Sequence, residues 1–409
     1  MMAALFPAIE SQTDMDGTRG PLDGIRIIDL TRVLAGPYAT MVLADLGAEV
    51  WKVETPDGGD DARGIGPFLD RTDGGPASAY FASLNRGKYG IALDLKADDD
   101  RALFERMLGH ADILVENFRP GTMDRLGYGA DRLASRFPSL VLASVSGFGQ
   151  TGPYAGRAAY DMVVQAMGGI MSVTGMPGGP PVRVGTSIGD IAAGLFTAIG
   201  ILAALHERGR SGRGRHVDVA MLDCQIAILE NAISRFFASG VAPGPLGARH
   251  PSITPFAAYR TADGFIVIAA GNDQLFARLA DCLGRPHWTS DPRFGDNDRR
   301  TAHAEDLEAE IEAVLSGHGT AHWLAQLGEA GIPCGPINDI AAALADPQVS
   351  ARNMTIAAGE SAAGPVRMAG NPIKISDISD PATRRPAPAL DADRALILER
   401  LAALEAAAQ

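Results

Sequence analysis

The sequence is poor in the features that mark secreted, metal-binding and nucleic-acid-binding proteins. Its 409 residues include three cysteines, an odd number that fits a reducing compartment better than a disulfide framework. Its eight histidines form neither an HExxH motif nor a pair with metal-ligand spacing, so we expect no bound metal ion. The formal net charge of −13 argues against nucleic acid or an anionic membrane as the main partner.

Long hydrophobic runs and targeting signals are also missing. The longest apolar stretch, around Gly194–Leu205, is shorter than the roughly 20 residues that a membrane-spanning helix needs. The first residues, MMAALFPAIESQTDMDG, have no basic region followed by a long apolar core, so we expect no secretion signal. We therefore expect a cytoplasmic protein that spans no membrane.

What the sequence does contain is an alternation of buried strands and helices. IRIIDL at 25–30 predicts a strand, YATMVLADLG at 38–47 a helix and EVWKVE at 49–54 a second strand, which together favour a parallel βαβ unit. Similar strand patterns follow at 90–95 (GIALDL), 112–118 (DILVENF), 140–149 (LVLASVSGFG) and 217–222 (VDVAML). The predicted fold class is therefore α/β, with an open parallel sheet.

Composition divides the chain into five parts. A flexible tail at 1–20 precedes a large domain, whose first part is 21–225, and a linker follows at 226–246 where glycine and proline accumulate. We expect a smaller α+β domain at 247–330, with a hairpin in AAYRTADGFIVIAAG. Residues 331–409 are expected to return to the large domain, so that both ends of the chain build it.

One carboxylate stands at the start of the most apolar helix that we predict. Asp190 lies in RVGTSIGDIAAGLF, after a glycine-rich loop and before a run of small and aliphatic residues. Aspartate is typical of a helix N-cap, where its oxygen accepts hydrogen bonds from free backbone N–H groups. The same position favours an ionised carboxylate, and small neighbours leave room for a bulky ligand, so Asp190 is also a candidate nucleophile. The local sequence leaves both interpretations open.

Two short motifs match active-site patterns but lack the context that those patterns need. GFGQTG at 147–152 fits a dinucleotide-binding loop, yet Pro153 follows at once and no acidic residue stands at the required distance. GTSIG at 185–189 fits the nucleophile elbow of hydrolases, but a segment rich in glycine and proline precedes it instead of a firm core strand. We expect a turn at the first motif and a loop or cap role for Ser187. An acyl hydrolase that uses Ser187 stays an alternative function.

Basic residues fall mostly at or just after the predicted strand ends. This edge of an open α/β sheet binds ligands, so a phosphate pocket is one interpretation and an ordinary solvated surface is the other. The residues are Lys52, Arg63, Arg86, Lys88, Lys96, Arg119 and Arg125.

Several segments, in order along the chain, resemble the signature blocks of family III CoA-transferases, the group of formyl-CoA transferase and carnitine CoA-transferase. They are PLDGIRIIDLTRVLAGP, GAEVWKVE, SLNRGKYGIALDL, ADILVENFRPGTMDRLG, SGFGQTGP, IGDIAAG, GRGRHVDVAMLD and GIPCGPI. The resemblance covers nearly the whole chain from Pro21 onward. It implies a Rossmann-like large domain with a smaller inserted domain, an interlocked homodimer, and coenzyme A as part of the substrate without a permanently bound cofactor.

The resemblance also implies roles for single residues. Asp190 occupies the position of the family's nucleophile, which forms a mixed anhydride and then an aspartyl-CoA thioester while CoA passes from an acyl-CoA to a carboxylic acid. Thr55 stands where relatives often carry a basic residue, so we expect Lys52 or another residue to bind phosphate there. The implied coenzyme A site comprises Leu34, Ala35, Lys52, Leu93, Asp94, Leu95, Lys96, Asn117, Phe118, Arg119, Arg125, Tyr160 and Asp161.

The segment at 247–276 is most similar to the branch that moves CoA between succinyl-CoA and glutarate or similar dicarboxylates. Arg249, with His250 beside it, stands in the loop that replaces the glycine-rich lid of formyl-CoA transferase. A guanidinium binds a carboxylate through two parallel hydrogen bonds, so Arg249 is a candidate to hold the distal carboxylate of the acceptor. A solvated loop residue is the alternative. We expect an acceptor of five or six carbons, such as glutarate, itaconate or a methylated succinate.

A 2-methylacyl-CoA racemase with the same fold is the close alternative. In that branch a histidine precedes the residue that aligns with Asp161 and forms a two-base pair with the aspartate at position 190. Here Tyr160 occupies that position, and a phenol with an unperturbed pKa of about 10 is a poor general base near neutral pH. We therefore predict transfer rather than racemisation.

Overall fold

The computed structural model describes residues 20–70, 75–361 and 364–408, so the predicted tail at 1–20 lies outside the described residues except for Gly20. Contacts group the chain into two compact units. Among the described residues, unit 1 comprises 20–70, 75–170, 183–234, 347–361 and 364–408, and unit 2 comprises 171–182 and 235–346. The domain boundaries drawn from the sequence stay a prediction.

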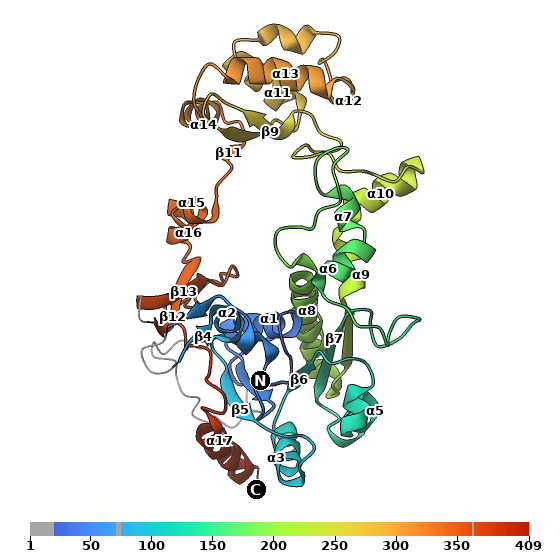
Figure 1. Cartoon of the computed structure of the whole chain (residues 1–409), viewed down its shortest axis with the longest axis vertical. Coiled ribbons are helices and arrows are strands. Elements are labelled where there is room, and N and C mark those ends of the chain that lie inside the picture. Colours follow the sequence, from blue (N-terminus) through green and yellow to red (C-terminus); the bar gives the residue numbers. More distant parts are fainter. Residues whose placement is uncertain (1–19, 71–74, 362–363, 409) are drawn as a thin grey trace, which may run out of the picture. The chain divides into compact units, whose positions relative to one another are not determined.

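A six-stranded parallel sheet forms the centre of unit 1, which confirms the predicted α/β class (Figure 1). Its strands are β1 (Arg26–Asp29), β2 (Glu49–Glu54), β5 (Tyr89–Ala92), β6 (Ile113–Glu116), β7 (Val141–Ser146) and β8 (His216–Ala220). They lie in the order β5-β2-β1-β6-β7-β8, and all neighbouring pairs are parallel. The chain builds the sheet outward from β1 on one side and then from β6 on the other. The carboxyl ends of β1 and β6 are therefore the topological switch point, where open α/β sheets bind ligands.

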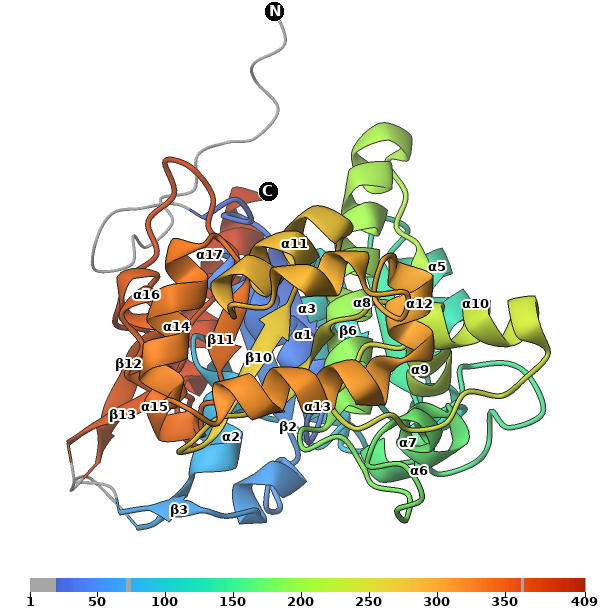
Figure 2. The ribbon, with the colours of Figure 1, turned by 90° about the horizontal axis from the view of Figure 1, so that it is seen from above.

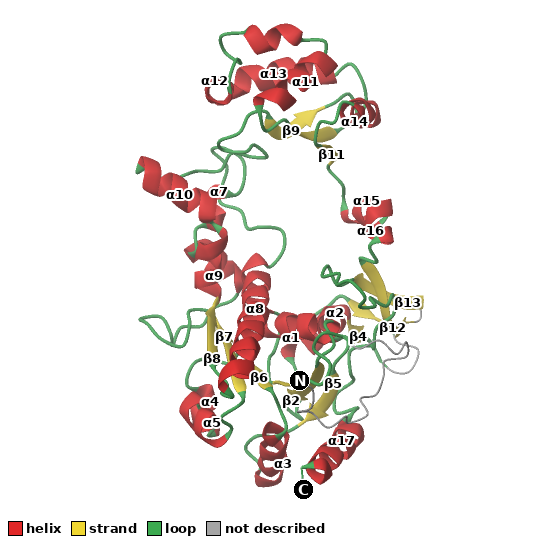
Figure 3. Cartoon of the chain, turned by 180° about the vertical axis from the view of Figure 1, so that it is seen from behind, coloured by secondary structure: helices red, strands yellow, loops and turns green. Residues whose placement is uncertain are grey.

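Helices cover both faces of this sheet. On one face α1 (Ala35–Asp45) and α8 (Ile188–Ser211) pack on Ile27, Val50 and Ile113, and on the other face α3 (Asp98–Gly109) and α17 (Arg394–Ala407) pack on Ile28 and Leu114. Successive residues of a strand point to opposite faces, which is why neighbouring isoleucines serve the two cores. Figure 3 shows α8 against β7 and β8 from behind. Since α17 is the last helix of the chain, both chain ends build unit 1, as the sequence predicted.

Shorter elements complete unit 1 and join it to unit 2. They are η1 (Asp61–Gly64), β3 (Phe68–Leu69), β4 (Ala77–Ser78), α2 (Ala79–Asn85), α4 (Thr122–Leu126), α5 (Ala130–Arg136), α6 (Asp161–Met167), α7 (Ile170–Val173), α9 (Met221–Ile228), α10 (Glu230–Ser239), α16 (Pro347–Ala351), β12 (Thr355–Ser361) and β13 (Gly364–Ala369).

Unit 2 has an antiparallel sheet of three strands with helices around it, the α+β composition that the sequence predicts. Strands β9 (Phe256–Arg260) and β10 (Phe265–Ala269) form the predicted hairpin, and β11 (Cys334–Pro336) pairs with β10. The hydrophobic core of unit 2 includes Ile266, Ile268, Phe276, Trp288 and Leu307. The other elements are α11 (Asp273–Cys282), η2 (Pro286–Ser290), α12 (Asn297–Ala302), α13 (Ala304–Leu315), α14 (Thr320–Glu329) and α15 (Ile340–Leu344).

Helix α8 corrects one expectation from the sequence. It is 24 residues long with a window mean hydropathy of 2.0, so by length and composition it is able to cross a membrane. The apolar stretch Gly194–Leu205 underestimated the length of the helix, because α8 begins earlier, at Ile188, and ends later, at Ser211. One such helix is weak evidence for a membrane span, and Ala193, Ala198 and Ile201 on α8 are buried in the cores of unit 1.

Candidate active site

The loops that follow β1 and β6 meet at the switch point of the sheet. Asn117, just after β6, donates a hydrogen bond from Nδ2 to the carbonyl oxygen of Arg32 at 2.8 Å. Its Oδ1 accepts from the backbone N–H of Arg32, also at 2.8 Å. Leu34 and Ala35 directly follow this loop, so the two hydrogen bonds bring the residues after β1 and β6 that we predict to bind coenzyme A to one edge of the sheet.

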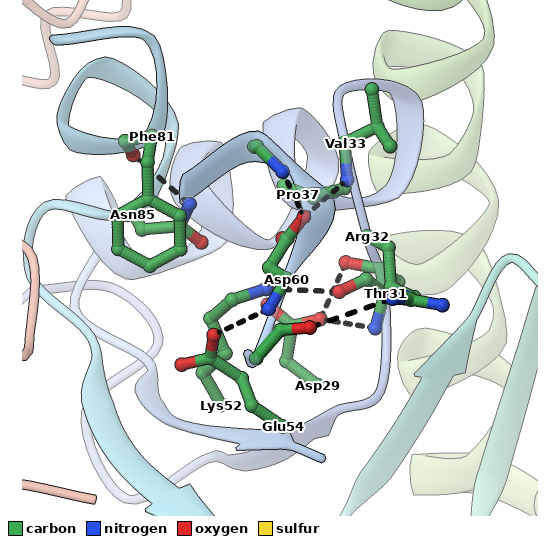
Figure 4. Close-up of polar contacts among 12 residues, drawn as sticks. Asp29, Thr31, Arg32, Val33, Pro37, Lys52, Glu54, Asp60, Phe81 and Asn85 are labelled. Carbon is green, nitrogen blue, oxygen red and sulfur yellow. Dashed lines mark hydrogen bonds and ion pairs between the residues drawn. The ribbon is translucent and has the colours of Figure 1, made fainter. Parts of the chain in front are cut away.

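Beneath these loops lies a buried ionic network, part of which Figure 4 shows. The Nζ of Lys88 lies 2.9 Å from the Oδ2 of Asp29, and the Nζ of Lys52 lies 2.9 Å from the Oδ2 of Asp60. All four side chains are buried. Burial alone would raise the pKa of Asp29, but the ammonium groups of Lys88 and Lys52 outweigh it and hold the pKa well below its usual value. These two buried ion pairs therefore stabilise the loops at the switch point.

This network changes the role that we assign to Lys52. Its ammonium group has no exposed surface, pairs with Asp60 and donates to the carbonyl oxygen of Thr31 at 2.9 Å. A buried ammonium with such partners is not free to hold a phosphate, so this geometry does not favour the predicted phosphate contact.

The other basic residues at the strand ends divide into two groups. Arg63 pairs with Glu54 and Arg86 pairs with Asp45, each at 2.6 Å, so these arginines, like the two buried lysines, stabilise the fold. The remaining three are exposed and available to an anion. They are Lys96, Arg119 and Arg125.

Asp190 lies in the first turn of α8, three residues after Ser187, which occupies the N-cap position. The capping interpretation of Asp190 is therefore wrong, and Ser187 itself makes no capping hydrogen bond with its side chain. Burial, and then the negative charge of Asp161, raises the pKa of Asp190 to about 7. A carboxyl group that titrates near neutral pH is typical of an active site.

Asp161, the first residue of α6, fixes the start of α8. Its Oδ1 accepts from the backbone N–H of Gly189 at 2.8 Å, and its Oδ2 accepts from the Nε2 of Gln165 at 2.8 Å. A guanidinium nitrogen of Arg183 lies 3.6 Å from the same Oδ2. Asp161 thus supplies the cap that Ser187 does not, and it holds a second carboxylate near Asp190. The neighbouring side chain of Tyr160 is exposed.

The start of α1 and the first turns of α8 are in close contact. A Cβ atom on Gly194 would lie 2.7 Å from the carbonyl oxygen of Ala35, so only glycine allows this approach. The two helices lie side by side in both views (Figures 1 and 2). Gly194 stands one turn after Asp190, so this contact packs the N-terminal part of α8 against the start of α1.

Tyr80, on α2, belongs to this site although the sequence reasoning missed it. Burial and the negative charges of Asp190, Asp60 and Asp161 raise the pKa of its phenol to about 12, so the phenol lies within electrostatic reach of all three carboxylates. Its surroundings, ASAYFASLN, follow the pattern of any short buried helix and gave no signal.

Other predicted residues lie around this edge of unit 1. Leu93–Lys96 directly follow β5, and Phe118 and Arg119 follow β6. A cavity of about 260 Å³ opens beside Arg119 and is lined by Glu116, Ser144 and His216 among others, but Asp190 is not part of its lining. Arg125 is exposed and donates to the Oγ1 of Thr122.

Arg249 and His250 belong to unit 2. His250 stacks on Phe256 with the ring centroids 5.3 Å apart. Burial and the like charge of Glu312 raise the pKa of Glu308, and the positive charge of Arg249 opposes this rise, so Arg249 lies near Glu308. That Arg249 meets the acceptor stays a prediction. Among the described residues, no group of three or more histidine, cysteine and acidic side chains is placed to hold a metal ion.

Comparisons with known proteins agree over almost the whole chain. A family model described as CoA-transferase family III matches residues 22–394. The acetyl-CoA:oxalate CoA-transferase of Acetobacter aceti is 48% identical over 389 residues, 95% of this chain and 97% of that protein. The succinate–glutarate CoA-transferase of Agrobacterium fabrum is 43% identical over 346 residues, 84% of this chain and 86% of that protein. The crystal structure of a CaiB/BaiF family protein from Brucella suis superposes with a TM-score of 0.82 and 40% identity, covering 94% of this chain and all of that one.

Proposed function

The chain belongs to CoA-transferase family III and is an enzyme of the CoA-transferase type, and from this premise we propose that it moves CoA from succinyl-CoA to a small dicarboxylate with Asp190 as its nucleophile. The observation that carries the proposal is the half-buried carboxyl of Asp190 in the first turn of α8, because burial and the charge of Asp161 raise its pKa to about 7. Acyl-CoA and carboxylate substrates are consistent with the family.

The proposed reaction needs no redox partner and no net proton. The ionised carboxylate of Asp190 attacks the thioester carbonyl, the C–S bond breaks, and a mixed anhydride and CoA thiolate form. The thiolate attacks the carbonyl carbon of Asp190 and releases the donor acid, which leaves an aspartyl-CoA thioester. The acceptor carboxylate attacks that thioester and forms a second anhydride, and the freed thiolate attacks the acceptor acyl carbon. The products are the new acyl-CoA and the original carboxylate.

The exposed cations at the edge of unit 1 suit the phosphates of coenzyme A. Lys96 follows β5, Arg119 follows β6, and Arg125 lies on α4, which the chain reaches after β6. Local positive charge of this kind attracts an anionic ligand although the chain as a whole carries a formal net charge of −13. We assign phosphate binding to these residues instead of Lys52.

A dicarboxylate acceptor agrees with the names of the relatives. One relative is named for oxalate and the other for glutarate, and both acids carry two carboxylates. The succinate in the second name supports succinyl-CoA as the donor. Arg249 is our candidate for the distal carboxylate, because a guanidinium binds a carboxylate with two parallel hydrogen bonds.

A panel of acids tests this proposal. Succinyl-CoA and acetyl-CoA are each offered with oxalate, glutarate, itaconate, mesaconate, formate and carnitine, and acyl-CoA products are separated by chromatography. We expect succinyl-CoA with a dicarboxylate of five or six carbons to give the largest kcat/KM. Arg249→Ala should raise the acceptor KM by about tenfold or more, roughly 1.4 kcal/mol, without changing the donor KM. The matched control is Arg260→Ala, which removes another arginine of unit 2.

The outcomes of the panel separate the parts of the proposal. A preference for formate or carnitine would refute the dicarboxylate acceptor, and a preference for oxalate would refute the five- or six-carbon acceptor, while the transferase stands in both cases. Acceptor-independent hydrolysis that Ser187→Ala abolishes would instead make the protein a hydrolase. Exchange of deuterium into the α-carbon of a 2-methylacyl-CoA at a comparable rate would make it a racemase.

The homodimer also stays a proposal, supported by an apolar stripe on α8. Leu195, Phe196, Ile199 and Leu202 are exposed in the single chain and recur at helical spacing. An exposed apolar stripe is typical of a surface that another chain covers. Sedimentation of the purified protein should give twice the mass of one chain, and the mass of a single chain would contradict the proposal. A cytoplasmic location remains an expectation.

A further inference from the structure

The loop before α8 carries a cation whose hydrogen-bonding groups are unused. The side chain of Arg183 is 39% exposed, and its one ionic contact among the described residues is with Asp161, whose Oδ2 lies 3.6 Å from a guanidinium nitrogen. That separation is too long for a hydrogen bond, so within the described part of the chain the guanidinium donates none. The five N–H groups of this side chain are therefore available to a ligand.

Gln165, on α6, fixes the backbone of this loop beside Asp161. Its side chain is fully buried. Its Oε1 accepts from the backbone N–H of Val184 at 2.9 Å, and its Nε2 donates to the Oδ2 of Asp161 at 2.8 Å. Since Val184 directly follows Arg183, one buried amide holds the backbone at Arg183 close to α6 while the guanidinium stays partly exposed.

Asp161 also connects this loop to the proposed nucleophile. Its Oδ1 accepts from the backbone N–H of Gly189, which directly precedes Asp190, and its Oδ2 faces Arg183. One carboxylate therefore has the first turn of α8 at one oxygen and the guanidinium of Arg183 near the other. The raised pKa of Asp190 agrees with this arrangement, since the charge of Asp161 contributes to it.

The surroundings of Asp190 are negatively charged. The carboxylates of Asp190, Asp161 and Asp60 all act on the phenol of Tyr80. The acyl group of succinyl-CoA would bring a further carboxylate to this site, which like charges disfavour unless a cation compensates them. Arg183 is a partly exposed cation at the edge of these carboxylates, and a guanidinium binds a carboxylate through two parallel hydrogen bonds.

We propose that Arg183 binds the distal carboxylate of the acyl group while that group is attached to Asp190, and thereby selects dicarboxylic over monocarboxylic acyl-CoA donors. This inference rests on the proposed function, since it takes succinyl-CoA as the donor and Asp190 as the nucleophile. The contact forms and breaks no covalent bond, so the reaction steps stay as described. Arg249 keeps its proposed role toward the free acceptor acid.

The test compares two donors of equal chain length in variants of the full chain. Butyryl-CoA differs from succinyl-CoA in carrying a methyl group in place of the distal carboxylate. In the proposed two-stage reaction, kcat/KM for a donor reports the steps up to release of its acid, so the acceptor does not enter. We expect the wild type to prefer succinyl-CoA. Arg183→Ala should lower kcat/KM for succinyl-CoA by about tenfold or more and change that for butyryl-CoA by less than about threefold.

The matched control is Arg210→Ala, which removes an exposed arginine at the opposite end of α8 and should leave both donors unchanged. Arg183→Lys keeps a positive charge near Asp161 but loses the two parallel donors. It should therefore reduce only the activity with succinyl-CoA, by less than Arg183→Ala does. Ethylguanidinium added to Arg183→Ala should restore activity with succinyl-CoA and leave that with butyryl-CoA unchanged.

Equal losses with the two donors in Arg183→Ala would mean that Arg183 acts only through Asp161, and would overturn the inference. Wild-type discrimination between the donors in Arg183→Ala overturns it as well. If Arg183→Ala does not fold, the same comparison is made in Arg183→Lys, where equal losses or unchanged discrimination again overturn it. Failure of the proposed function looks different, because the wild type would then use butyryl-CoA as readily as succinyl-CoA, or use neither.

Discussion

At the scale of single residues, the defining feature is a carboxyl group that titrates near neutral pH. Burial disfavours the charged form of Asp190, and Asp161 adds a second negative charge nearby. A carboxylate of raised pKa is a stronger nucleophile than an ordinary one, and it is still ionised in a large fraction of molecules at pH 7. The environment that makes Asp190 costly to ionise therefore also suits it to attack a thioester.

The pH profile tests this description. The nucleophile must be ionised, so kcat/KM for succinyl-CoA should rise about tenfold per pH unit below pH 6 and level off above about pH 8. Asp161→Asn removes the neighbouring charge and keeps an oxygen for the N–H of Gly189, so the midpoint should move to lower pH. The exposed Asp61→Asn should leave the midpoint in place. A profile that is flat from pH 5 to 8, or a midpoint that moves upward in Asp161→Asn, would contradict this account.

At the scale of helices and strands, close packing between α1 and α8 places the site. The approach of the two helices depends on Gly194, whose missing side chain makes room for the carbonyl oxygen of Ala35. Asp161 from α6 then caps α8 and fixes its first turn. The position of Asp190 therefore follows from contacts of α8 with two other helices, and not from its own sequence alone.

Glycine substitutions in α8 test this packing. In Gly194→Ala the added methyl group would meet the backbone of Ala35 at 2.7 Å, so α8 must shift. We expect a loss of about 1–3 kcal/mol in the free energy of unfolding and a fall of about tenfold or more in kcat/KM. Gly209→Ala is the matched control in the same helix, because nothing lies within 4 Å of its new methyl group, and it should stabilise by about 0.5–1 kcal/mol. Equal effects of the two substitutions in chemical denaturation would disprove the packing argument.

Local sequence patterns predicted most elements of unit 1, because the hydrophobic pattern of a buried strand lies within the strand itself. EVWKVE at 49–54 and LVLASVSGFG at 140–149 overlap β2 and β7 closely. The ionic network was not predictable in this way. Lys88 and Asp29 are 59 residues apart, and a lysine next to a strand gives no local sign of whether it will be buried with a partner or exposed to a ligand.

The site was predictable only in part for the same reason. The resemblance assigned Asp190 and the loops after β1, β5 and β6, but it also assigned Lys52, whose ammonium the fold has buried. Tyr80 was missed because its electrostatic interaction with the carboxylates arises from the placement of α2, which its own residues do not encode.

At the scale of the whole molecule, both ends of the chain build the unit that contains Asp190. Asp190 lies in unit 1 and Arg249 lies in unit 2, and our proposal gives them separate roles, nucleophile for Asp190 and acceptor selectivity for Arg249. That division predicts independent effects, in which Asp190 variants abolish transfer from every donor to every acceptor, while Arg249 variants change only the ranking of acceptors. The claim common to all three scales is that Asp190 carries the covalent intermediate.

The most direct test of that claim is mass spectrometry of the enzyme during turnover. Wild-type protein is mixed with succinyl-CoA in the absence of an acceptor, quenched in acid and digested with trypsin, and the peptide Val184–Arg208 is fragmented. We predict that CoA is attached to Asp190 as a thioester, that hydroxylamine converts it to the hydroxamate, and that Asp190→Asn carries neither adduct and transfers several orders of magnitude more slowly. An adduct on Ser187 or another residue, or an Asp190→Asn variant that transfers CoA at the wild-type rate, would contradict the account.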